Sequence, residues 1–320
     1  MTPPVAYDSA ARVTSIFDLD TKRAIRTALS REAYERNSVR IVDGSVEGFD
    51  WLVASNRHLY AVSPTQSKII MHGWFFGLVF FAGNLFLFEN CALRDRNLPM
   101  GRIVRLQYRN HQFEDPQVIV KGLNANCHQI AVIDGKLCIV DTANQAVLRY
   151  SLHGVAIDQQ RPFPHASPGD RSGAYLHINS IARVGDRIGL MLHNGNAVPE
   201  KRSEIAWLDR DWQVVERADI DGYMCHDIVA DGDGTLWHSA SKTGEIISSD
   251  GRRFQISDRL MTRGIAFRRE LVAVGLSTFG PRQVRDFLGG EVVILRTDFT
   301  EIRRFRLRGS PADIVQIARD

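Results

Sequence analysis

Short apolar runs separated by turn residues repeat along most of the chain. Residues 127–152, CHQIAVIDGKLCIVDTANQAVLRYSL, contain an apolar run, an Asp134-Gly135 turn, a second apolar run, a polar break at 141–144 and a third apolar run. Runs of this length between tight turns are typical of antiparallel β-strands. Successive parallel strands need a crossover helix, and the repeat contains no such segment. The pattern therefore favours an all-β fold over a parallel α/β sheet.

The same layout recurs in other parts of the chain. Copies align at residues 51–71, 75–91, 179–196, 225–248 and 262–277, and a single apolar run, ADIVQI, lies at 312–317. Most copies are about 35–50 residues apart, the spacing of four-stranded propeller blades. We predict a β-propeller of about six blades, in which the last run completes the blade begun at 51–71 and so closes the ring. A seventh blade is the alternative if residues 37–43 belong to a further, degenerate copy.

A different periodicity precedes the repeat. Residues 21–36, TKRAIRTALSREAYER, place apolar side chains on one helical face: Ile25, Ala28, Leu29 and Ala33. We predict an amphipathic helix that lies outside the ring and is capped by Asp20. Its basic face is interpreted as solvated. The predicted organisation is an N-terminal extension, 1–45, followed by a single propeller domain, 46–320.

The most apolar stretch, residues 73–88, does not predict a membrane span. It is shorter than the roughly 20 residues that a spanning helix needs, and Gly77, Gly83 and Asn84 interrupt it. We predict two buried strands joined by a turn at residues 82–84.

The charge balance and the cysteine content disfavour several classes of protein. The chain has 40 Lys+Arg against 37 Asp+Glu, a net charge of +3, which predicts no strong attraction to nucleic acid or an anionic membrane. Its 4 cysteines include no CxxC and are too few for a disulfide scaffold. The N-terminus shows no basic start followed by an apolar run. We expect a reduced, cytoplasmic protein whose partner is a small-molecule substrate.

Several segments resemble known propeller families. Residues 126–152 resemble NHL-type repeats, and LYAVSPTQSKI, LHINSIA, TRGIAF, LVAVGLS and ADIVQI occur in the order seen in a bacterial propeller family of unknown function. The chain is more distantly similar to gluconolactonase, strictosidine synthase and virginiamycin B lyase propellers. The acidic and Asn metal pattern of the gluconolactonase group has only a short counterpart, EGFDW at 47–51. The resemblance implies the fold and no established reaction.

Aligning the copies predicts a ring of residues at one rim of the central channel. The start of the first strand in each copy is Phe76, His128, Asn179, His226, Arg263 or Ala312. His177 shares a side with Asn179 because strand side chains alternate. We therefore predict a divalent metal site, with open coordination positions, that is formed by the imidazoles of His128, His177 and His226. The alternative is a set of polar pore residues that bond to one another and to water. Cys127 and Cys225, which alternate with the ring, are expected to pack between blades.

Other residues complete the predicted site. His193 follows a second strand and is a candidate general base, whereas His238 is expected to pack within its strand. Arg263 suits a carboxylate or phosphate of the ligand, or else bridges to Asp227 or Asp313. Asn179 and Phe76 are predicted to contact substrate.

The resulting function hypothesis is a metal-dependent lyase or hydrolase that acts on a small polar or anionic substrate at the channel mouth. The alternative is a non-catalytic propeller that binds a ligand or a protein. The chain contains no GxGxxG opening a helix, P-loop, HExxH or GxSxG motif.

Overall fold

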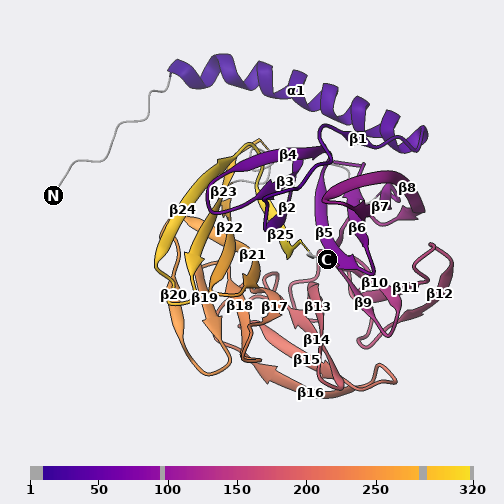
Figure 1. The fold of residues 1–320 in the computed structure, drawn as a ribbon. Helices are drawn as coiled ribbons and strands as arrows, with labels where there is room; N and C mark the ends of the chain where they lie inside the picture. The colour runs from indigo at the N-terminus through magenta and orange to yellow at the C-terminus, as the bar shows by residue number, and fades with distance from the viewer. Residues whose placement is uncertain (1–9, 94–97, 281–286, 318–320) are drawn as a thin grey trace.

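Six antiparallel sheets surround a central channel in a computed structural model that describes residues 10–93, 98–280 and 287–317. Figure 1 shows the sheets arranged as the blades of a propeller. The predicted all-β propeller is confirmed, with six blades.

Each blade contains four consecutive antiparallel strands, except that the first combines strands from both ends of the chain. Blade 1 consists of β25 (Pro311–Gln316), β2 (Trp51–Ser55), β3 (His58–Val62), β4 (Ser67–His72) and β1 (Arg40–Ile41). Blade 2 consists of β5 (Phe75–Phe81), β6 (Asn84–Asn90), β7 (Gly101–Arg109) and β8 (Gln112–Leu123). Blade 3 consists of β9 (Cys127–Ile133), β10 (Lys136–Asp141), β11 (Ala146–Tyr150) and β12 (Ala156–Gln160). Blade 4 consists of β13 (Ile178–Val184), β14 (Arg187–Leu192), β15 (Glu204–Leu208) and β16 (Val214–Asp219). Blade 5 consists of β17 (His226–Ala230), β18 (Leu236–Ala240), β19 (Glu245–Ser248) and β20 (Arg253–Gln255). Blade 6 consists of β21 (Leu260–Arg268), β22 (Leu271–Thr278), β23 (Gly290–Arg296) and β24 (Glu301–Leu307).

The C-terminal strand closes the ring as predicted. β25 pairs antiparallel with β2, from Trp51 opposite Gln316 to Ala54 opposite Asp313. At the other edge of this blade, β1 pairs with β4 through Arg40 and His72. Residues 40 and 41 therefore extend blade 1 and do not begin a seventh blade.

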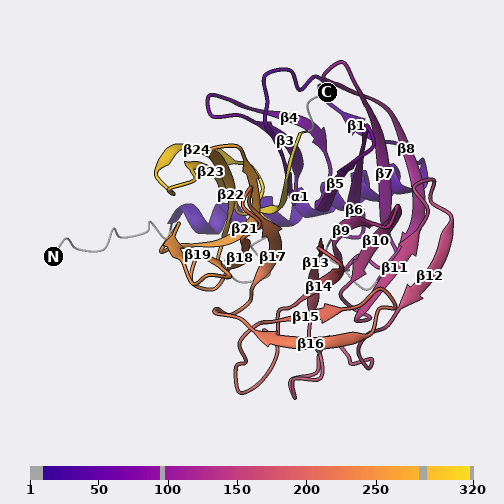
Figure 2. The ribbon, with the colours of Figure 1, turned by 60° about the horizontal axis from the view of Figure 1, so that its bottom comes forward.

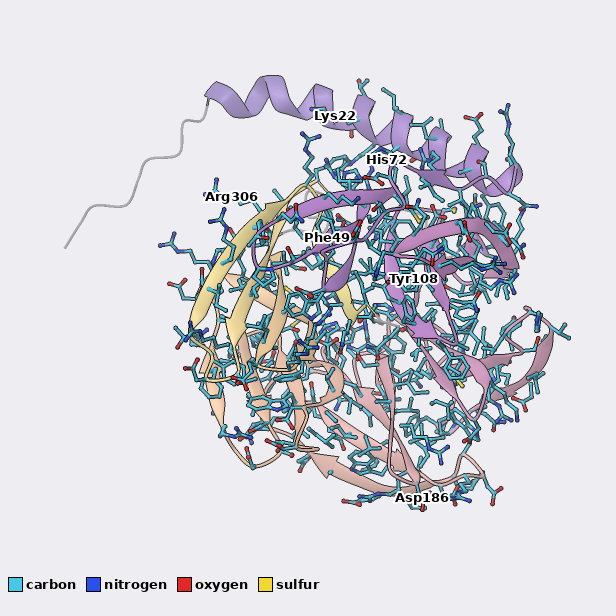
Figure 3. The ribbon with its side chains drawn as sticks, viewed as in Figure 1. Lys22, Phe49, His72, Tyr108, Asp186 and Arg306 are labelled. Atoms are coloured by element: carbon cyan, nitrogen blue, oxygen red, sulfur yellow. The ribbon has the colours of Figure 1, made fainter. Side chains whose placement is uncertain are left out.

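Apolar side chains fill the spaces between blades. One cluster joins blades 3 and 4 through Val140, Val147, Ile178 and Leu190. Figure 3 shows side chains filling the ring, with Asp186 in the β13–β14 turn at the edge farthest from the helix. Fully burying an aliphatic side chain contributes about 1.5–3 kcal/mol, so contact between blades supplies much of the fold's stability.

The buried cysteines support this arrangement. Cys127 and Cys225 are fully buried in inter-blade clusters, which confirms the packing role predicted for them. Burial is the main cause that raises the thiol pKa of Cys225 to about 12 and that of Cys127 well above its usual value.

The apolar stretch at 73–88 forms β5 and β6, as predicted. Ala82 and Gly83 join the two strands with φ values of 47° and 68°, the left-handed geometry of a tight hairpin turn. Among the described residues, no helix has the combined length and apolar character needed to cross a bilayer.

The N-terminal helix, α1 (Ala10–Glu35), starts before the predicted residue 21. Asp20 is not its N-cap but lies within it, where its carboxylate accepts a hydrogen bond from Arg23 Nη1 at 3.0 Å. No Gly or Pro occurs between residues 10 and 36, so nothing stops the helix at Asp20. Figure 1 shows α1 outside the ring of blades, and Figure 2 shows it passing behind them.

A buried arginine fastens the end of this helix to blade 2. Arg102 Nη1 donates to the carbonyl of Ala33 and Nη2 to that of Ser38, both at 2.8 Å. Its Nε and Nη2 also donate to Glu89 Oε2 at 2.8 and 2.7 Å. The pair is almost completely buried, so each charge depends on the other for compensation.

Candidate functional site

The innermost strand of every blade is irregular at the same point, and this point coincides with the aligned ring. The ladder skips Phe76, Asn179 and Ala312 in their strands. In the other blades the register shift spans His128 and Arg263 or directly follows His226. A bulge redirects the side chain at its position. The bulges therefore explain how the side chain of one residue in each blade comes to face the channel.

A cavity of about 240 Å³ opens at this end of the channel. Its polar wall includes His128, His177, His193 and Arg263, and its apolar wall includes Phe76. Further lining residues are Asn56, Trp74, Gly195, Asn196, Met224, Met261, Ser277, Ser310, Pro311 and Ala312. Deeper in the channel, a space of about 10 Å³, room for one water, is lined by Asn179, His226 and Asp227 among others.

Four imidazoles form a row across the mouth. Ring centroids are 5.4 Å apart for His128 and His177, 4.5 Å for His177 and His193, and 5.1 Å for His193 and His226. The structure therefore brings the three predicted ligand histidines together, with His193 between His177 and His226. Phe76 continues the row, 5.2 Å from His128.

Two of these rings are held in the same way by equivalent parts of their blades. His128 Nδ1 lies 2.8 Å from the carbonyl of Asn126, and His226 Nδ1 lies 2.9 Å from that of Met224. A carbonyl only accepts, so each Nδ1 carries the proton and each Nε2 has the lone pair. Hydroxyls that follow the second strand, Thr142 and Ser241, lie 2.8 Å from the same nitrogens.

His193 has the opposite tautomer. Gly195 N–H donates to its Nδ1 at 3.1 Å, so a neutral His193 ring carries its proton on Nε2. The sequence predicted a general base here, but this tautomer suits a hydrogen-bond donor. Burial, and then the charge of His177, hold the pKa of His193 well below its usual range. The ring is therefore neutral at pH 7.

Arg263 contacts the end of the row. Its Nη2 donates to His226 Nε2 at 2.7 Å, which satisfies that lone pair with a permanent cation. Burial and then Arg263 hold the pKa of His226 well below its usual range. A dication on the same nitrogen does not fit this arrangement. Among the described residues no three His, Cys, Asp or Glu side chains form a metal-ligand group. The three-histidine metal site stays a prediction.

Residues one position beyond the ring join neighbouring blades. Asp313 accepts from Leu78 N–H at 2.8 Å, and Ser180 accepts from Asp227 N–H at 2.9 Å. Asp227 in turn accepts from Gly264 N–H at 2.9 Å. Gln129 Oε1 makes the same kind of bond with Ile181 N–H at 2.9 Å. These bonds give both buried aspartates a role in fastening the channel wall.

Burial disfavours the charged form of both Asp227 and Asp313. It raises the pKa of Asp227 to about 6 and, together with the charge of Asp227, raises that of Asp313 well above its usual value. Asn179 lines the same small space as Asp227 and donates Nδ2–H to the carbonyl of Cys225 at 2.9 Å. Its Oδ1 is buried with no hydrogen-bond partner among the described residues. It offers an acceptor to a water or ligand donor.

Four residues around the channel mouth have a left-handed backbone conformation. His177, Asn194, Met224 and Asp227 have φ values of 53°, 56°, 55° and 65°, which non-glycine residues seldom adopt. Such residues cluster at functional sites, where surrounding structure compensates their cost.

Asn56, Thr142 and Ser241 escaped the sequence analysis, which singled out only His193 among the residues that directly follow the second strand of a blade. Asn56 follows β2 and lines the cavity, as His193 does after β14. Arg26 of α1 donates to the carbonyl of Asn56 at 2.7 Å, so the helix borders the mouth. Thr142 and Ser241 occupy the same place in their copies. The corresponding position in each aligned copy would have been the usable signal.

Comparison with known proteins supports the architecture alone. No family model and no curated protein matches the chain. A solved nidogen/laminin complex contains a chain that is similar over 85% of this chain and 99% of its own, at 13% identity and a TM-score of 0.61. A protein of unknown function from Bacteroides caccae covers the same shares at 9% identity and a TM-score of 0.54.

Two further solved structures are similar to this chain. A putative gluconolactonase is similar over 86% of this chain and 89% of its own, at 10% identity and a TM-score of 0.53. A virginiamycin B lyase from Staphylococcus aureus is similar over 70% and 76%, at 16% identity and a TM-score of 0.44. At 10% identity the likeness to the putative gluconolactonase shows a shared propeller fold alone, and function has to be argued from the site.

Proposed function

We propose that the channel mouth is the active site of a hydrolase or lyase that acts on a small anionic substrate by acid–base chemistry. The observation that carries the proposal is the contact of Arg263 with His226 beside two further imidazoles of opposite tautomer. Arg263 binds a carboxylate or phosphate of the substrate. A guanidinium has five N–H donors, so it can hold His226 and an anion together.

The tautomers assign the remaining roles. His128 presents an Nε2 lone pair and takes a proton from a water or a substrate carbon. Neutral His193 donates from Nε2–H to the substrate oxygen on which negative charge develops. Proton removal from water leads to hydrolysis of an ester or lactone, and removal from carbon leads to elimination. The cavity of about 240 Å³ limits the substrate to a small molecule.

Binding and turnover test the two halves of the proposal. We would titrate small mono- and dicarboxylates, sugar acids and inorganic phosphate by calorimetry into tag-free protein. Hydrolysis of lactones and esters is followed by proton release, and elimination by the ultraviolet absorbance of the new conjugated double bond. Arg263→Gln is expected to abolish anion binding, whereas Arg259→Gln, at an exposed arginine, leaves it unchanged. His193→Phe is expected to retain binding and lose turnover.

Three other experimental outcomes would change this assignment. Anion binding without turnover of any substrate class would indicate the non-catalytic propeller. Binding that survives Arg263→Gln would overturn the proposal. About one equivalent of metal, lost in His128→Ala, would support the three-histidine metal site. His153→Ala, at an exposed turn, is the control.

A further inference from the structure

A second cavity, of about 450 Å³, lies between blades 4 and 5. It shares no lining residue with the cavity at the mouth. Its walls come from β15 and β16 on one side and from β17, β18 and β19 on the other. The volume lies within the range of small-molecule binding sites.

The walls of this inter-blade cavity are apolar. Ile205, Trp207, Ile228 and Ile247 are buried, and they belong to the cluster that joins the two blades. Ala218, Ile220 and Leu236 are half-buried and complete the lining. The flat indole of Trp207 suits an aromatic ring. The charged residues of the lining, Arg202, Asp219 and Asp221, are exposed, so the buried part of the wall suits an uncharged group.

One buried side chain supplies a polar contact. His238, 6% exposed, lines the cavity and faces the carbonyl of Asp221, 2.8 Å from its Nε2. That carbonyl only accepts, so Nε2 carries the proton and Nδ1 of the neutral ring has the lone pair. Among the described residues no donor reaches Nδ1.

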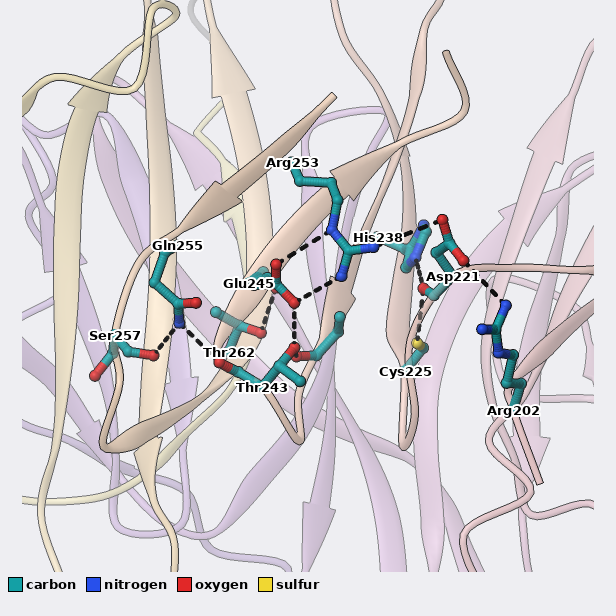
Figure 4. Close-up of polar contacts among 11 residues, drawn as sticks. Arg202, Asp221, Cys225, His238, Thr243, Glu245, Arg253, Gln255, Ser257 and Thr262 are labelled. Carbon is teal, nitrogen blue, oxygen red and sulfur yellow. Dashed lines mark hydrogen bonds and ion pairs between the residues drawn. The ribbon is translucent and has the colours of Figure 1, made fainter. Parts of the chain in front are cut away.

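The surroundings hold this histidine in place. Figure 4 shows His238 beside Asp221, whose carboxylate contacts Arg202 at 3.2 Å and Arg253 at 3.7 Å. The thiol of Cys225 also donates to the Asp221 carbonyl, at 3.8 Å. Because carbonyl and carboxylate are both anchored, the tautomer of His238 is set before any ligand arrives.

We propose that the inter-blade cavity binds a small phenol, with the ring against Trp207 and the isoleucines and the hydroxyl donating to His238 Nδ1. A carboxylate is disfavoured because it would face the lone pair at Nδ1 and the acidic groups of Asp219 and Asp221, and because Arg202, the cation in the lining, is already paired with Asp221 at 3.2 Å. A hydrocarbon would leave the acceptor at Nδ1 without a hydrogen bond.

Calorimetry with two probes tests this proposal on the full chain. 4-Methylphenol is expected to bind about tenfold more tightly than toluene, its counterpart without the hydroxyl. His238→Phe is expected to remove this preference. Ala218→Phe fills the cavity from β16 and is expected to abolish binding of both probes, whereas Ala156→Phe, on the outermost strand of blade 3, leaves binding unchanged.

The overturning results are equally direct. Equal affinity of the wild type for both probes, no binding of 4-methylphenol, or binding that survives Ala218→Phe would each refute the site. Should circular dichroism show that Ala218→Phe does not fold, Ile220→Trp fills the same space from the next half-buried position. The comparison of the two probes needs only the wild-type protein, so equal affinity or the absence of binding refutes the proposal even if a variant fails to fold.

Discussion

Arg263 Nη2 lies 2.7 Å from the unprotonated Nε2 of His226, so a permanent cation adjoins a ring that would otherwise be able to gain a proton there. This contact joins blades 5 and 6 at the channel mouth and sets the charge of the site. It also links two residues 37 positions apart that the aligned copies place at the same level.

Removing the cation is expected to raise the pKa of His226. In Arg263→Met, repulsion by the guanidinium disappears, and burial, the larger cause, keeps the value below the usual one for histidine. A pH titration of labelled imidazole carbons by NMR measures the change. Arg259→Met, at an exposed arginine, is the control, and an unchanged His226 titration in Arg263→Met would contradict the electrostatic assignment.

Asp227 is expected to make the protein less stable as the pH rises from about 4 to about 6. Its folded pKa of about 6 exceeds the ordinary value of 3.8, so the unfolded chain releases this proton first and the folded state loses stability across that window. The loss approaches about 3 kcal/mol. Asp227→Asn should remove this part of the pH dependence while keeping an acceptor for Gly264 N–H.

Urea unfolding of wild type and Asp227→Asn at several pH values checks this prediction. The difference between their unfolding free energies should change in favour of the variant from pH 4 to pH 7. The neighbouring Asp313 titrates in both proteins, and its pKa is expected to fall in the variant because the charge of Asp227 raises it in the wild type. A constant difference would show that Asp227 stays charged throughout.

The repeat made the ring of channel residues predictable because each copy preserves its register. Phe76, Asn179 and Ala312 could be aligned from turn and strand signals alone, and the structure places each at a bulge. The start of α1 was not predictable in this way. Helix formation through Asp20 depends on the whole uninterrupted segment and not on a local capping signal.

Contacts across blades escaped prediction for a different reason. Nothing in the sequence near Arg102 indicates that it reaches the carbonyls of Ala33 and Ser38. The position of His193 between two other imidazoles likewise depends on how blades 4 and 5 pack. Periodicity describes a blade, whereas the site arises where blades meet.

Gly264 is expected to be required for the closure of blade 6 on blade 1. Its φ of 81° is left-handed, and a Cβ would lie 2.7 Å from Ile314 Cγ1 and 3.0 Å from Ile314 N. Gly264→Ala should therefore cost more than about 2 kcal/mol. Gly135→Ala is the matched control, since its φ is 69° and nothing lies within 4 Å; it should cost only about 1 kcal/mol. Urea unfolding compares them, and equal costs would refute the close approach.

Arg102→Ala is expected to detach the end of α1 and to cost about 3–5 kcal/mol. The substitution leaves Glu89 buried without its partner, and it removes the guanidinium donors from the carbonyls of Ala33 and Ser38. Hydrogen exchange should therefore accelerate across residues 20–38 more than in the blades distant from the helix. Arg36→Ala, directly after the helix, breaks an exposed pair with Glu32 of α1 and should change stability by less than about 1 kcal/mol. If Arg102→Ala destabilised the protein without faster exchange in the helix, Arg102 would stabilise blade 2 alone, and α1 would be held by its contacts at Asn56 and Pro99.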